Sequence, residues 1–79
     1  MHQQFLLVVP DGWTDIGDIN VILQHTSIDN IQSSINEQTW WAIDQVLEAA
    51  GLLPLNQNVS EANLFNDGTQ YKLWVRYTT

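Results

Sequence analysis

Two apolar segments, one near each end of the chain, carry the patterns of β-strands. Residues 4–9, QFLLVV, form a continuous apolar run that is followed by the turn signal Pro10-Asp11-Gly12. Such a continuous run is typical of a strand that is buried on both faces. Residues 70–77, QYKLWVRY, alternate strictly, as a half-buried strand does. We therefore predict two strands that can pair in one sheet.

The clearest helix of the chain is predicted over residues 37–50. Asn36 is a good N-cap for it, Glu37 lies in the first turn, where the helix dipole favours an acid, and Gly51 can end it. At about 100° per residue, its apolar side chains gather on about a third of the helical circle. They are Trp40, Ile43, Val46, Leu47 and Ala50. This stripe is the predicted core face of the helix.

Two shorter segments before this helix also favour helical structure. Residues 19–25, INVILQH, alternate like a strand but also fit a helix that is capped by Asp18. We favour the helix because the next segment is helical. In that segment Ser27 can act as the N-cap, and isoleucines recur on one helical face, at Ile28, Ile31 and Ile35.

The remaining segments complete a small α+β domain that covers residues 1–79. Residues 55–63 are predicted as a polar loop, with a short extra strand near residues 63–66 as an option before an Asn-Asp-Gly turn signal. The predicted order is β-α-α-β, with a short β-sheet packed against the main amphipathic helix. A two-stranded ribbon is weak in isolation. The pattern therefore favours either completion of the sheet by a second copy or a further strand at residues 19–24.

One tryptophan lies on the polar side of the main helix. Trp41 follows Trp40 by about 100° on the helical circle, and the acidic residues on that side are Glu37, Asp44 and Glu48. Fully exposed tryptophan is uncommon in monomers, whereas tryptophan with a charged rim is typical of binding hot spots. We interpret Trp41 and these three acids as a protein-interface surface.

A second tryptophan lies on the outward side of the last strand. The side chains that point to the predicted core are those of Tyr71, Leu73, Val75 and Tyr77. Trp74 points the other way, between Lys72 and Arg76, which are the only lysine and arginine of the chain. Because a guanidinium can stack on a tryptophan ring, we interpret Lys72, Trp74 and Arg76 as a second interface.

Both tryptophans also have a simpler interpretation, in which a loop of the same chain covers them. Residues 10–18 or 52–63 can do so. If both are exposed, the cationic strand face of one copy can meet the acidic helix face of another and form a homo-oligomer. The expected partners are therefore a second copy, a larger protein, or both.

Composition and charge limit the classes of partner that we expect. The 79 residues include nine carboxylates, two cations and no cysteine, for a net charge of −7. This balance opposes direct binding to nucleic acid or anionic membranes. It either favours a partner with a basic surface or only keeps the chain soluble. No apolar run approaches the ~20 residues of a membrane span, and no signal peptide is recognised. We expect the protein in the cytoplasm of the producing or host cell, or in a virion.

No arrangement in the sequence predicts catalysis, a cofactor or a metal. Asp11, Asp15 and Asp18 do not have the spacing of a calcium loop. His25 and Thr26 place an imidazole beside a hydroxyl, but a chain of this length rarely encloses a catalytic cleft. Without cysteine, disulfides and thiolate zinc sites are excluded. We therefore expect a non-enzymatic protein.

The general composition is similar to that of small phage-encoded proteins, which serve as virion accessory components or as inhibitors of host defence. The shared features are short length, acidity, many amides, no cysteine and spare tryptophans. We expect a protein-protein interaction module that oligomerises or docks on a larger protein, as a structural accessory of a virion. The alternative is a small acidic inhibitor that binds and blocks a host nucleic-acid-binding or defence protein.

Overall fold

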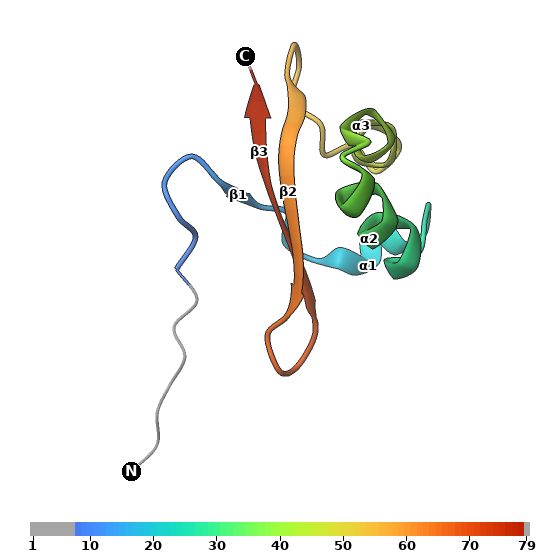
Figure 1. The fold of residues 1–79 in the computed structure, drawn as a ribbon, viewed down its shortest axis with the longest axis vertical. Helices are drawn as coiled ribbons and strands as arrows, with labels where there is room; N and C mark the ends of the chain where they lie inside the picture. The colour runs from blue at the N-terminus through green and yellow to red at the C-terminus, as the bar shows by residue number, and fades with distance from the viewer. Residues whose placement is uncertain (1–7, 79) are drawn as a thin grey trace.

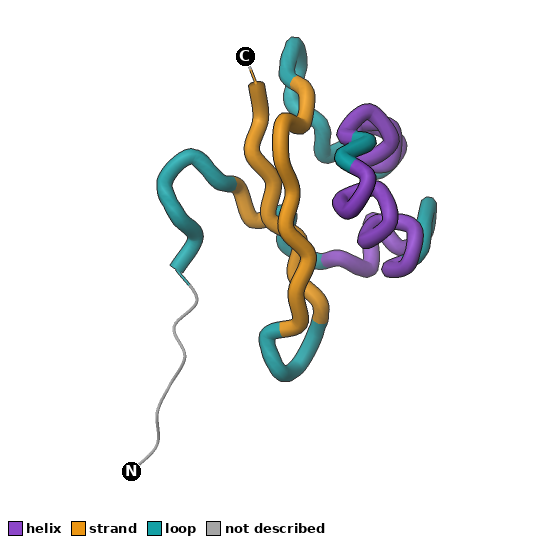
Figure 2. The backbone as a smooth tube through the Cα atoms, viewed as in Figure 1, coloured by secondary structure: helices purple, strands orange, loops and turns teal. Residues whose placement is uncertain are grey.

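The computed structural model describes residues 8–78, in which three helices lie on one side of a three-stranded antiparallel sheet (Figure 1). The elements, in chain order, are β1 (Thr14–Asp15), α1 (Ile19–Leu23), α2 (Ile28–Glu37), α3 (Trp40–Ala49), β2 (Asn58–Asn66) and β3 (Tyr71–Thr78). The strands lie in the order β1-β3-β2, and the helices gather beside them (Figure 2). The predicted α+β class is confirmed, with the order β-α-α-α-β-β.

The two short helices begin where the sequence predicts. The Asp18 carboxylate accepts a hydrogen bond from the backbone N–H of Asn20 at 2.9 Å, and α1 follows it. The Ser27 hydroxyl accepts from the backbone N–H of Asn30 at 3.1 Å, and α2 follows it. Each side chain thus accepts a hydrogen bond from a backbone N–H that has no partner within the first helical turn. The helical interpretation of residues 19–25 is confirmed, and the alternative strand at 19–24 is wrong.

The predicted start of the main helix is wrong, because the chain turns before it. Asn36 and Glu37 end α2, and α3 begins only at Trp40. Gln38 has a φ of 57°, and Thr39 N–H donates to the Ser34 carbonyl at 2.9 Å. This is the left-handed hydrogen-bonded ending that glycine usually provides. Because no glycine marks this turn, the sequence pattern predicts residues 37–50 as one uninterrupted helix.

The predicted polar loop over residues 55–63 is also wrong, because most of it belongs to β2. Within β2, Val59 and Ala62 are buried and the exposed positions are mainly polar. A bulge between Val59 and Glu61 places the buried residues three apart and hides the alternation of a strand. The predicted last strand is confirmed as β3, which pairs with β2 along its whole length.

The N-terminal strand predicted over residues 4–9 lies mostly outside the described residues. Val8 and Val9 are not part of a strand, and Val8 is 77% exposed. The sheet gains its third strand from β1, which pairs Thr14 with Val75 and Asp15 with Trp74. The chain therefore completes the two-stranded ribbon with its own loop segment.

One small core holds the helices on the inner face of the sheet. Its buried members are Ile19, Ile22, Ile31, Ile43, Leu47, Val59, Ala62, Leu73 and Val75. Every described element except β1 contributes to this cluster, and the predicted stripe of the main helix supplies Ile43 and Leu47. The Asp44 carboxylate also accepts a hydrogen bond from Val59 N–H at 2.6 Å, which joins α3 to β2.

We expect Leu47→Ala to lower the free energy of unfolding by about 2–5 kcal/mol, since Leu47 is fully buried and its truncation leaves a cavity. The matched control is Leu55→Ala, because Leu55 is 88% exposed and its loss changes stability by less than about 0.5 kcal/mol. Urea unfolding followed by tryptophan fluorescence measures both. Equal midpoints for the two variants would contradict the position of the core.

In the turn between β2 and β3, the Asp67 carboxylate accepts three hydrogen bonds. Hydrogen bonds from the backbone N–H groups of Gln70 and Thr69, and from the Thr69 hydroxyl, lower the pKa of Asp67 from 3.8 to about 2. The folded pKa is thus below the unfolded one. The contribution of Asp67 to stability is fully present above pH 3.8 and is lost as the pH falls through about 2.

We therefore expect Asp67→Asn to remove part of the acid sensitivity of the fold. Asparagine keeps a side-chain oxygen that can accept the turn hydrogen bonds, but it does not titrate. The free energy of unfolding is measured at a series of pH values between about 5 and 2 for both proteins. The native curve should fall more steeply than that of the variant in this range, and parallel curves would show that the turn does not depend on the charge.

Candidate functional site

Trp41, the tryptophan predicted on the polar side of the main helix, is exposed. It lies in the first turn of α3, and 64% of its surface is accessible within the described residues. Neither residues 10–18 nor residues 52–63 cover it. The alternative in which one of these loops hides Trp41 is therefore wrong.

The acidic residues predicted around Trp41 have different positions and roles. Glu37 is exposed, but it comes from the end of α2 because the chain turns at Gln38. The Asp44 carboxylate is partly buried in its bond to Val59 N–H. Glu48, which lies two turns after Trp41, is exposed. The predicted acidic face of a single helix is thus formed by two helices, and Asp44 serves the junction with the sheet.

The helical part of the molecule carries one sign of charge. Residues 18–51, which include the three helices, contain no lysine or arginine. Their five carboxylates are Asp18, Asp29, Glu37, Asp44 and Glu48. We call this part the helical layer. Its negative field extends about a Debye length, roughly 8 Å at physiological ionic strength, and favours a partner with positive charge.

Both cations of the chain lie on the outer face of the sheet and are paired there. Lys72 Nζ is 3.1 Å from Asp15 Oδ2, and Arg76 Nη1 is 3.2 Å from Glu61 Oε1. The Arg76 guanidinium also lies 5.8 Å from the ring centre of Trp13. The stacking partner of Arg76 is therefore Trp13, where the sequence suggested Trp74, because β1 brings the preceding loop onto this face.

Trp74 is partly covered by its neighbours on the same face. Its ring meets the ring of Phe65 edge to face, with centres 4.7 Å apart and an angle of 78°. The indole Nε1 is buried and has no hydrogen-bond partner among the described residues. Lys72, Trp74 and Arg76 are thus together in space, and each of the two cations has a carboxylate partner on the same face.

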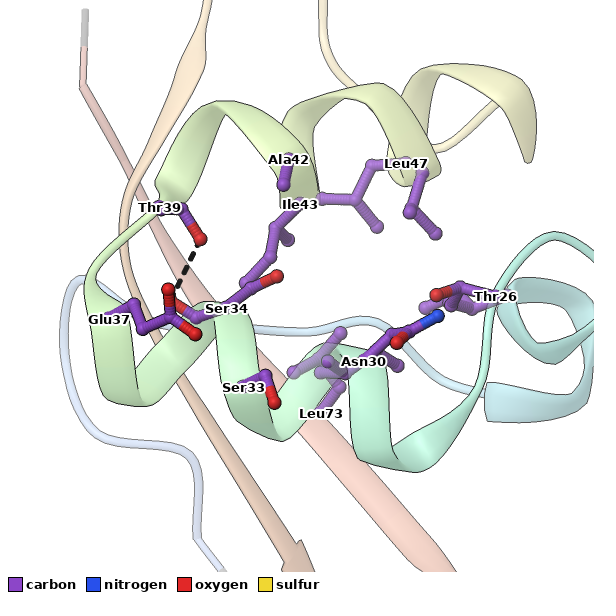
Figure 3. Close-up of a pocket in the computed structure, with 13 residues that line it drawn as sticks. Thr26, Asn30, Ser33, Ser34, Glu37, Thr39, Ala42, Ile43, Leu47 and Leu73 are labelled. Carbon is purple, nitrogen blue, oxygen red and sulfur yellow. Dashed lines mark hydrogen bonds between the residues drawn. The ribbon is translucent and has the colours of Figure 1, made fainter.

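A groove that the sequence did not predict opens between α2 and α3 (Figure 3). Its volume is about 370 Å³. Apolar side chains form its floor: Ile22, Ile31, Ala42, Ile43, Val46, Leu47 and Leu73. Polar side chains form its rim: Thr26, Asn30, Ser33, Ser34, Glu37 and Thr39. Within α2, the rim residues 30, 33, 34 and 37 recur at helical spacing, which is the signal that could have indicated a second, polar face of this helix.

The residues considered for chemistry in the sequence lie apart or have structural roles. His25 is exposed, and the Ser27 hydroxyl caps α2. Asp15 is paired with Lys72, and Asp18 caps α1. Within residues 8–78, no three histidine, aspartate or glutamate side chains are placed to hold a metal ion together.

Comparisons of this chain with protein-family models, with curated proteins and with solved structures found no match. Among the described helices, none has both the length and the apolar character needed to cross a membrane. The features of this chain that bear on function are therefore the exposed Trp41, the groove between α2 and α3, and the negative charge of the helical layer.

The two tryptophans should differ in their effect on stability. We expect Trp74→Ala to cost about 2 kcal/mol or more, because it removes a packed ring and its contact with Phe65. Trp41→Ala should change the free energy of unfolding by less than about 0.5 kcal/mol, since the ring is mostly exposed. Urea unfolding followed by circular dichroism measures both variants. A large decrease in the free energy of unfolding of Trp41→Ala would mean that other parts of the protein cover this ring.

Proposed function

We propose that this chain is a non-enzymatic protein-docking module that binds a larger protein with a basic surface through its helical layer. The observation that carries the proposal is Trp41, a large aromatic side chain with 64% of its surface exposed on a layer without cations. Tryptophan is the residue type most enriched at interface hot spots. An exposed tryptophan that contributes little to its own fold is best explained by a partner that buries it.

Charge favours a foreign partner over a second copy. In a homo-oligomer of the kind considered above, Lys72 and Arg76 of one copy would neutralise the acidic layer of another. Both cations already have carboxylate partners, Asp15 and Glu61, in their own chain. Two copies of the helical layer would instead repel each other, so a homo-oligomer is the second form of the proposal.

The concrete role that we propose is that of an accessory component of a virion or a similar assembly. It is supported by the compositional likeness to small phage-encoded proteins and by the exposed Trp41 on the helical layer. Such a component adds to a larger structure through one face and exposes the rest of its surface to solvent.

A second candidate function is inhibition of a basic host protein. The observation that favours it is the uniform negative charge of residues 18–51, which could compete for a surface that binds nucleic acid or serves in host defence. The two functions differ in a simple observation. An inhibitor binds a soluble target with an affinity that falls steeply with salt, whereas an accessory component is found in assembled particles.

Site-specific photo-crosslinking in the producing cell tests the docking proposal. A photo-reactive phenylalanine derivative replaces Trp41 in one protein and Thr69, in the exposed β2–β3 turn, in the control. We expect a crosslinked product from position 41 that is heavier than two copies of this chain, and none from position 69. A product of twice the chain mass indicates a homo-oligomer. Equal products, or none, from the two positions would refute docking through Trp41.

A further inference from the structure

We propose that the groove between α2 and α3 receives one apolar side chain from a lysine- or arginine-rich segment of the partner, an inference that rests on the proposed docking function. The groove of about 370 Å³ is at the small end of ligand pockets, which span roughly 300–1,000 Å³. This space suits a single side-chain anchor better than a large ligand.

The walls of the groove have the chemistry of an anchor pocket. Ile43 and Leu47 from α3 point into it, with Leu73 of β3 behind them (Figure 3). Leu47 and Leu73 are almost completely buried and form the fixed base of the groove, so the apolar surface that an incoming group can contact comes from the partly exposed Ala42 and Val46. An apolar floor inside a polar rim is the usual arrangement at the centre of a protein interface.

The rim can contact the main chain and the polar groups of an incoming segment. Asn30, Ser33 and Thr26 lie along its α2 side (Figure 3). At the other end, the Thr39 hydroxyl donates to the Ser34 carbonyl at 3.3 Å and helps to close the turn that joins the two helices. The groove is therefore closed by the turn at one end and lined by small donors and acceptors on one side.

The charges around the groove determine which segment it accepts. Glu37 is part of the rim, and the exposed Asp29 and Glu48 belong to the same helical layer. No lysine or arginine in residues 18–51 opposes them. Trp41, which precedes Ala42 in the first turn of α3, has an exposed ring on which a lysine or arginine can stack. An apolar residue between cations fits these features, and an apolar residue between acids does not.

The test uses the full chain and two defined peptides. One is a short lysine-rich peptide with a central leucine, and the other has serine in place of that leucine. Binding is followed by NMR through the backbone amides of the protein. We expect the leucine peptide to bind roughly tenfold more tightly, or better, because burial of a leucine side chain contributes at least this much. The amides of Asn30, Ser34 and Ala42 should shift with the leucine peptide.

Two groove variants and one control locate the effect. Ala42→Phe fills the groove from its floor, and Ser33→Phe covers it from the exposed rim, where a change leaves the core intact. Ala49→Phe makes the same alanine-to-phenylalanine change at an exposed position of α3 outside the groove. Both groove variants should lose the preference for leucine over serine, and Ala49→Phe should keep it.

Equal binding of the two peptides to the native chain would overturn the inference, and so would the absence of binding to either peptide. An unchanged preference in a folded Ser33→Phe variant would overturn it as well. None of these results decides the docking proposal, which is judged by crosslinks from position 41. A heavy crosslinked product together with equal peptide binding would mean that Trp41 docks on a partner and that the groove does not take part.

Discussion

The rest of the structure depends on burial of the inner face of β3. Leu73 and Val75 are almost completely inaccessible because they lie in a core cluster to which all three helices and β2 contribute. A chain of this length can form only one small core, and no disulfide or thiolate metal site supplements it. The helices α1, α2 and α3 each contribute one or two side chains to the same cluster, which are Ile19, Ile22, Ile31, Ile43 and Leu47. The helices are therefore held by the sheet, and their other faces are available to solvent or to a partner.

The turn at Gln38 leaves a groove between two helices that both pack on the sheet. If residues 28–50 formed one straight helix, only one stripe of it could face β3. The left-handed residue lets α2 and α3 leave the turn in different directions, so that both place isoleucines in the core and a groove remains between them. The same turn moves Glu37 from the first turn of α3 to the end of α2. The groove and the position of Glu37 on its rim have this one cause.

The distribution of charge follows from the way the sheet is completed. Asp15 of β1 and Glu61 of β2 meet the two cations of β3 on the outer face. The lysine and the arginine of the chain are thereby both paired with carboxylates of the sheet. The helical layer is left with carboxylates alone, and its net charge argues for a partner that supplies the missing sign. The two faces of the molecule thus differ in charge: on one both cations are paired with carboxylates, and the other is acidic and has an exposed tryptophan.

Local signals in the sequence determined the parts of this protein that depend on a few neighbouring residues. Asp18 and Ser27 cap helices because each side chain needs only a backbone N–H two or three residues away. The strand at 71–78 and the exposure of Trp41 follow from the periodicity of single elements. Only the tertiary structure decided that residues 58–66 form a strand, because their hydrogen-bond partners lie in β3 and a bulge hides their alternation. It also decided the pairing of both cations, because Lys72 pairs with Asp15 of β1 and Arg76 pairs with Glu61 of β2. The groove depends on the turn at Gln38, which no glycine marks in the sequence.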